Sequence, residues 1–205
     1  MKYEEKERDE VIKIIKEFYP QECAFYEKKY RDSVEYKKYN YIVNNLNSRD
    51  VLEERFYNML CVIFQDYYVK RWTNTTYPSI QFSVLLHKNQ PILDDDIELM
   101  SVLQGKRYNL EIFISRISPY YYAYTSEERY VDSEWSFEIH PSDYILEVKY
   151  LRQLEKEMFL NGMKKLSRKL AHTSVPFVET ELLPRDGKEV EIFNCLFSDM
   201  VTTYY

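Results

Sequence analysis

Side chains that could hold a metal ion and activate a water molecule lie between residues 138 and 149. Glu147 and Lys149 form an acid-x-lysine triplet with Val148 between them. The possible metal ligands that precede this triplet are Glu138, His140 and Asp143. Carboxylate oxygens suit Mg²⁺, and a lysine beside the ion can position the attacking water. These residue types at this spacing indicate metal-assisted hydrolysis as one hypothesis.

The triplet resembles the (D/E)xK element of the PD-(D/E)xK nucleases. This resemblance implies a metal-dependent nuclease that uses Asp143, Glu147 and Lys149. The sequence departs from the family's pattern, because those enzymes carry the first acid and the triplet on separate edges of a hairpin. Here Asp143 precedes Glu147 by only four residues, and the segment continues into a predicted helix. A solvated first helical turn is the competing interpretation, and the nuclease is kept as an alternative.

Other reaction types find little support in the sequence. Its three glycines are isolated, whereas a phosphate-binding or dinucleotide-binding loop needs clustered glycines so that backbone N–H groups can approach the anion. The three histidines lack metal-binding spacing, and the three cysteines contain no CxxC pair. No GxSxG elbow marks a serine nucleophile. We therefore predict no cofactor, no metal site and no catalytic residue, with the nuclease as the exception to test.

Tyrosine is unusually frequent, with twenty-one residues in the chain, and is densest from Tyr120 to Tyr124. Successive side chains of a strand face opposite sides, so one or two of these tyrosines are expected to face solvent. Exposed tyrosines are enriched at protein interfaces, although cross-strand aromatic pairing is a competing interpretation. The predicted partner-binding residues are Tyr120, Tyr122, Tyr124, Glu127, Glu128, Asp132, Glu134 and Trp135.

The charge distribution favours a basic protein partner. A net charge of −6 opposes general binding to nucleic acid, which depends on neutralising phosphates with lysine and arginine. Carboxylates near the tyrosine cluster would form an acidic rim that steers a basic partner. The predicted helix over residues 142–170 is the exception, because it carries seven basic residues from Lys149 to Lys169. A phage or mobile-element protein that binds nucleic acid through this helix is a further alternative.

The elements that position these residues follow from hydrophobic periodicity. Residues 1–72 are predicted to be helical, with helices over 3–18, 22–46 and 50–67, the last opened by the capping-box pair Asp50 and Glu53. A strand is expected over 80–86, and a short helix follows, begun by Asp94, Asp95 and Asp96 and ended by Gly105. Three further strands form a predicted meander over 108–117, 120–125 and 134–140, with a loop over 126–133.

The last part of the chain is predicted to contain a long helix over 142–170 and a hairpin. The hairpin strands are expected at 175–183 and 188–197, around the turn sequence Pro184-Arg185-Asp186-Gly187. This order predicts an α+β fold with N-terminal helices, an antiparallel or mixed β-sheet meander, a long helix and a C-terminal β-hairpin, with the helices on one face. No linker-like stretch interrupts it, so we expect a single domain over 1–205, with a helical portion at 1–72 and a sheet-containing portion at 78–205.

The sequence gives no sign of a membrane protein or a secreted one. Residues 2–10 are highly charged, and no apolar run approaches the roughly 18 residues of a membrane span. We therefore expect a soluble cytoplasmic protein with no membrane partner and an unspecified oligomeric state. Scarce alanine and glycine beside abundant tyrosine, asparagine, lysine and isoleucine indicate an AT-rich genome, such as that of a bacterium or phage.

Taken over its whole length, the chain resembles the immunity proteins of bacterial polymorphic-toxin systems. The resemblance rests on its size, its acidity, its lack of catalytic motifs and its aromatic cluster rimmed by carboxylates. It implies that the protein binds a cognate toxin domain, often a basic nuclease, and inhibits it. No residue is carried over from the family, so the predicted contacts rest on the local pattern alone.

Overall fold

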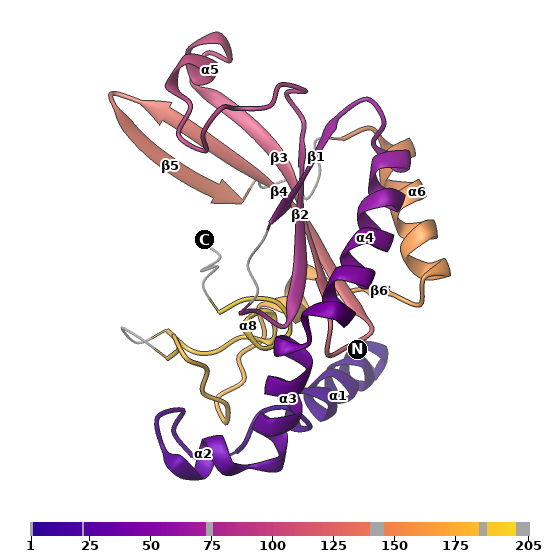
Figure 1. The fold of residues 1–205 in the computed structure, drawn as a ribbon, viewed down its shortest axis with the longest axis vertical. Coiled ribbons are helices and arrows are strands. Elements are labelled where there is room, and N and C mark those ends of the chain that lie inside the picture. Colours follow the sequence, from indigo (N-terminus) through magenta and orange to yellow (C-terminus); the bar gives the residue numbers. More distant parts are fainter. Residues whose placement is uncertain (1, 22, 73–75, 140–145, 185–187, 200–205) are drawn as a thin grey trace.

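The computed structural model describes residues 2–21, 23–72, 76–139, 146–184 and 188–199 (Figure 1). Within these residues the chain forms eight helices and one six-stranded sheet. The N-terminal helices precede a meander of strands, so the predicted α+β class is confirmed. Among the described helices, none is both long and apolar enough to cross a bilayer.

Four helices make up the N-terminal part: α1 (Lys2–Lys16), α2 (Lys28–Asp32), α3 (Val34–Asn44) and α4 (Leu46–Ile63). The single helix predicted over 22–46 is wrong, because Ser33 has an extended backbone and its hydroxyl accepts the N–H of Tyr36, which starts a new helix. The predicted cap at Asp50 is also wrong. The side chain of Asn45 accepts the N–H of Ser48 at 3.1 Å, so α4 begins earlier.

The sheet is an antiparallel meander with one short parallel addition. Its strands are β1 (Tyr68–Trp72), β2 (Ser79–Leu85), β3 (Lys106–Ser115), β4 (Tyr120–Val131), β5 (Glu134–Ile139) and β6 (Lys164–Lys165). The first five lie in chain order, and β6 pairs in parallel with the start of β4. β1 lies where the sequence predicted the helical portion to continue, so the end of that portion at residue 72 is wrong.

The connections of the meander are tighter than predicted. The loop expected over 126–133 is mostly strand, and β4 turns into β5 through Asp132 and Ser133, which both have positive φ. Before β3, the side chain of Asp96 caps α5 (Ile97–Val102) by accepting the N–H of Leu99 at 2.9 Å. Gly105 has φ of 79°, so the predicted cap and left-handed end of this helix are confirmed.

Helices cover both faces of the sheet, whereas the sequence predicted helices on one face (Figure 1). One face packs against α4 and α6 (Val148–Leu160), through residues such as Ile112 and Tyr121. Part of the other face packs against α1, α7 (Arg168–Ala171) and α8 (Ile192–Leu196), through residues such as Phe113 and Tyr122. The one-face prediction is wrong because neighbouring residues of β3 and β4 are apolar on both sides.

The C-terminal part differs most from prediction. The long helix expected over 142–170 ends at Leu160, and Gly162, with φ of 78°, begins the turn toward β6 and α7. The expected hairpin is reduced, in the part of it that the structure describes, to one bridge between Ser174 and Glu191. α8 occupies the place of its second strand, and Asn194 Oδ1 accepts the N–H of Glu191 at its start. Residues 185–187 of the predicted turn lie outside the described residues.

Candidate binding site

The structure buries the tyrosines that were expected to face a partner. Tyr120, Tyr122 and Tyr124 are only 1%, 2% and 7% exposed. Tyr122 packs edge-on against Phe193 of α8, with ring centroids 5.5 Å apart, while Tyr121 belongs to the core on the opposite face. The expected exposure is wrong because helices cover this end of β4 on both sides.

Three of the four predicted carboxylates fall into a buried and an exposed group. Glu127 is buried, and it pairs with Arg129 and, at 3.3 Å, with Lys106. Burial alone would raise the pKa of Glu127, but these two cations lower it below its ordinary value. Asp132 and Glu134 are exposed around the tip of the β4–β5 hairpin. Only this second group has the exposure expected of an acidic rim.

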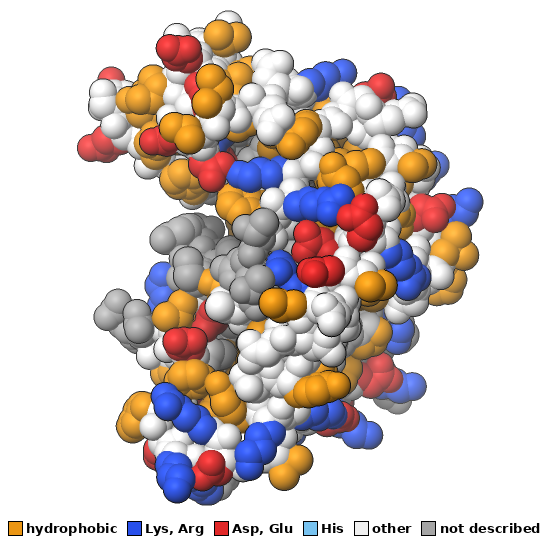
Figure 2. Space-filling model, in the orientation of Figure 1, with side chains coloured by type: hydrophobic (Ala, Val, Ile, Leu, Met, Phe, Trp, Pro, Cys, Tyr) orange, Lys and Arg blue, Asp and Glu red, His pale blue; other side chains and the backbone are white. Residues whose placement is uncertain are grey.

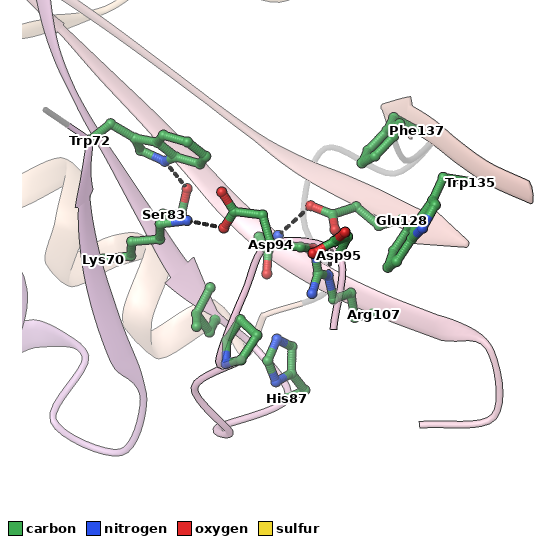
Figure 3. A pocket seen from close by; sticks show the side chains of 13 residues that line it. Lys70, Trp72, Ser83, His87, Asp94, Asp95, Arg107, Glu128, Trp135 and Phe137 are labelled. Atoms are coloured by element: carbon green, nitrogen blue, oxygen red, sulfur yellow. Dashed lines mark hydrogen bonds and ion pairs between the residues drawn. The ribbon is translucent and has the colours of Figure 1, made fainter. Parts of the chain in front are cut away.

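Glu128 and Trp135, the remaining predicted residues, line a pocket of about 300 Å³ (Figure 3). Its floor is formed by β1 to β4, and its walls by β5 and by residues 86–96, which connect β2 to α5. The pocket lies on the same sheet face as Tyr122 and Tyr124, because residues two apart along a strand face the same side. It therefore lies at the end of that face beyond the cover of α8.

Aromatic side chains flank the pocket. Trp72 of β1 lies at one side, and Trp135 and Phe137 of β5 lie at the other (Figure 3). Trp135 and Phe137 stack with ring planes at 12° and centroids 6.1 Å apart. Trp135 also contacts Tyr130 at 5.0 Å. These rings give the pocket fixed apolar walls of the kind that commonly surround bound ligands and partner side chains.

The floor carries a buried polar network centred on Glu128. Its carboxylate pairs with Nε of Arg107 and accepts Nδ2–H of Asn109 at 2.9 Å. Arg107 Nη2 also donates to the carbonyl of Asp94 at 2.5 Å. Nη1 of Arg107 and Oδ1 of Asn109 are left without a hydrogen-bond partner in the described structure, as are both ring nitrogens of His87. Buried polar atoms without a hydrogen-bond partner cost free energy. The pocket is therefore surrounded by polar groups whose hydrogen-bonding capacity is not used.

A second polar group lies beside the floor, on the same face of the sheet. Glu111 accepts hydrogen bonds from Ser83 Oγ at 2.6 Å and from Ser126 Oγ at 3.3 Å, and Ser83 in turn accepts Nε1–H of Trp72. Burial raises the pKa of Glu111 to about 7, a change that the charge of Glu128 reinforces and the donated hydrogen bonds oppose. This carboxyl can therefore change its charge near neutral pH.

The residues of the nuclease alternative do not meet this pocket. Glu147 precedes α6 on the opposite face of the sheet and pairs with Lys149 at 3.0 Å, with both side chains mostly exposed. Asp143 and His140 lie outside the described residues. Across the described parts of the chain, no three His, Cys, Asp or Glu side chains are grouped to hold a metal ion.

The basic surface predicted for one long helix is divided among three elements. Its residues belong to α6, β6 and α7, because the helix ends at Leu160. Several of them are engaged in ion pairs: Lys165 pairs with Glu155 at 2.9 Å, and Lys169 pairs with Glu4 at 3.3 Å. The single helical face on which the nucleic-acid alternative depended is therefore not formed.

Sequence reasoning missed most of the pocket residues. Its charged and aromatic members outside the prediction include Lys70, Trp72, His87, Arg107 and Phe137. One signal was present in the sequence: Arg107, Asn109 and Glu111 put polar groups at alternate positions of an otherwise apolar strand.

No protein-family model matches the chain, and no curated protein or solved structure is significantly similar to it.

Proposed function

We propose that this chain is a protein-binding module that holds a basic partner at the end of the molecule formed by α5 and the β4–β5 hairpin. In the cytoplasm it would act as an immunity protein, which binds a toxin domain and blocks it. The observation that carries the proposal is an aromatic-walled pocket with an apolar and acidic rim.

The rim presents large apolar side chains to solvent. Ile92 is 87% exposed, and Leu93 and Phe137 are also mostly exposed, all next to the pocket. Figure 2 shows hydrophobic and acidic side chains intermixed over this end of the molecule. Grouped exposed apolar residues around a concave site are typical of protein interfaces, where an anchoring side chain fills the pocket.

The charges at this end favour a basic partner. Four of its cations are already engaged: Lys70 pairs with Asp94, Arg107 with Glu128, and Lys106 and Arg129 with Glu127. The exposed carboxylates include Asp95, Asp132 and Glu134. In a chain of net charge −6, such a rim would accelerate association with a positively charged surface.

Affinity capture with matched variants tests this proposal. The tagged chain is incubated with a lysate of its native host, and retained proteins are identified by mass spectrometry. We expect one basic protein to be retained by the wild type and lost with Leu93→Asp. Phe159→Asp is the control, because Phe159 is also mostly exposed but lies on α6, behind the sheet. Retention by both variants, or loss with both, would contradict the proposed surface.

The inhibitory role needs a separate measurement. The captured protein is expressed in a heterologous bacterium, alone and together with this chain. Growth arrest by the partner alone, relieved by the wild-type chain but not by Leu93→Asp, is the expected result. A captured partner that does not arrest growth would remove the immunity role and leave a binding module of another kind.

A further inference from the structure

A second pocket, of about 400 Å³, is lined by residues of α3. Figure 1 shows α3 at the end of the molecule opposite to α5 and the β4–β5 hairpin. Its lining comes from α2 and α3, from the segments that precede α2 and β2, and from residues 180–182 and 199. Its aromatic lining residues are Tyr19, Phe25, Tyr30, Tyr36, Tyr39 and Tyr77. We refer to it as the tyrosine pocket.

The rings of the tyrosine pocket are held in fixed positions. Tyr36 contacts Tyr30 at a centroid distance of 5.3 Å and stacks on Tyr39 at 6.1 Å. The hydroxyl of Tyr19 donates to the carbonyl of Cys195 at 2.7 Å, and that of Tyr30 donates to the carbonyl of Glu179 at 2.8 Å. Because these hydroxyls are bound elsewhere, the rings offer their π-systems in a preorganised arrangement.

The charged residues that line this pocket, among those the structure describes, are Glu181 and Asp199, and both are acidic. Asp199 is partly buried, and its Oδ2 accepts the N–H of Leu182 at 3.3 Å. Two neighbouring cations do not line the pocket: Lys38 pairs with Glu17 at 2.7 Å and lies over Phe18. Arg116 donates to the carbonyl of Val43 at 3.0 Å and to that of Asn45 at 2.9 Å. The pocket therefore combines electron-rich rings with negative charge and draws no positive charge from its own lining.

We propose that the tyrosine pocket binds an organic cation, an alkylammonium or guanidinium group, between its rings and Asp199. Aromatic faces attract cations through the ring quadrupole, and the carboxylate supplies the countercharge. An anion would be repelled by both carboxylates, and a neutral ligand would gain no charge–charge attraction from them. The same group can come from a free amine or from a lysine or arginine side chain of a protein.

The proposal is tested first with two ligands of equal shape and different charge. Choline and 3,3-dimethyl-1-butanol are titrated separately into the full chain, and binding is followed by saturation-transfer difference NMR. We expect choline to bind roughly tenfold or more tightly, because only it carries the positive charge that the rings and Asp199 attract. Equal binding of the two ligands would overturn the proposal. So would the absence of choline binding at about 100 mM, a concentration that would saturate even a site with a Kd of about 1 mM.

Two variants locate the site. Asp199→Asn keeps the shape of the side chain and removes its charge, and Tyr36→Leu removes the central ring. Both should weaken choline binding several-fold, whereas Tyr26→Leu, at an exposed tyrosine that does not line the pocket, should leave it unchanged. Unchanged affinity in Asp199→Asn would place any choline binding elsewhere and overturn the assignment.

A third titration, with N-acetyl-lysine-N-methylamide, distinguishes the sources. Tighter binding than choline assigns the pocket to a lysine of a protein, and weaker binding assigns it to a free quaternary ammonium compound. The inference does not depend on the proposed function, because Leu93→Asp at the other end should abolish partner capture without changing choline affinity. The two proposals can therefore fail separately.

Discussion

The two ends of one sheet face differ in their side chains and in how far helices cover them. At one end, Phe113, Tyr122 and Tyr124 meet Phe193 and Phe197 and form a closed core. At the other end, the side chains that β3 and β4 place on this same face are polar, and the face opens into a pocket. The change from apolar to polar residues within a strand thus marks where the helical cover stops and where a partner could bind.

The largest effect is expected at the closed end. Phe193→Ala removes a fully buried ring that contacts Phe113, Tyr122 and Phe197, and we expect the free energy of unfolding to fall by about 4 kcal/mol. Urea denaturation followed by circular dichroism measures it. Phe137→Ala, at the open end, is the matched control and should cost far less because this ring is mostly exposed. Equal losses in the two variants would remove the distinction between the ends.

The next effect concerns the boundary between the ends, where Glu111 pairs in register with Tyr124. Its pKa is about 7 in the folded chain against an ordinary 4.5, so the folded state binds more protons than the unfolded state between these values. The contribution of Glu111 to stability is therefore fully present below about pH 4.5 and is lost as the pH rises through 7. At about 1.4 kcal/mol per pKa unit, the loss is roughly 3 kcal/mol.

Glu111→Gln tests this dependence, because glutamine does not titrate and can still accept a hydrogen bond from Ser83. We expect the difference in unfolding free energy between pH 5 and pH 8 to shrink by most of that amount in the variant. Urea denaturation of both proteins at the two pH values is the measurement. The same pH dependence in wild type and variant would show that Glu111 does not titrate near neutrality.

The sequence predicted individual helices and strands better than it predicted which faces of the sheet are covered. The strand β2 and the cap of α5 at Asp96 follow from local patterns, and the structure confirms them, although β2 is buried on both faces and not on one. The run from Tyr120 to Tyr124 was interpreted as alternating between core and solvent, although every residue in it is apolar or aromatic. A continuous apolar run is typical of a strand buried on both faces, which is what the structure has.

The open end could not be assembled from sequence, because its residues come from distant segments. Trp72, His87, Arg107 and Trp135 belong to different strands and connections, and no local spacing relates them. Of the predicted contacts, Glu128 and Trp135 line the pocket, and Asp132 and Glu134 lie exposed around the tip of the hairpin. What the sequence did offer was the polar alternation of β3, which becomes informative once the pairing of β3 with β2 and β4 is known.

A moderate effect is expected from the floor of the open end. Arg107→Leu removes the cation that pairs with Glu128 and leaves that carboxylate with the hydrogen bond from Asn109. We expect a loss of about 2 kcal/mol in unfolding free energy, together with weaker partner capture. Arg107→Lys should recover part of the stability, because it restores a positive charge without the planar group that reaches Asp94. A fully stable Arg107→Leu variant would show that the network contributes little.

The smallest effect is expected on the other face of the sheet, at the exposed pair of Glu147 and Lys149. Both side chains are solvated, so the pair adds little to stability, and Glu147→Ala should unfold at the same urea concentration as the wild type. The same variant distinguishes the binding module from the nuclease alternative. A binding module needs neither residue, so Glu147→Ala should capture the partner as the wild type does, with or without Mg²⁺. Magnesium-dependent cleavage of DNA by the wild type that disappears in Glu147→Ala would contradict the binding proposal, and would move the functional site from the open end of the sheet to the start of α6.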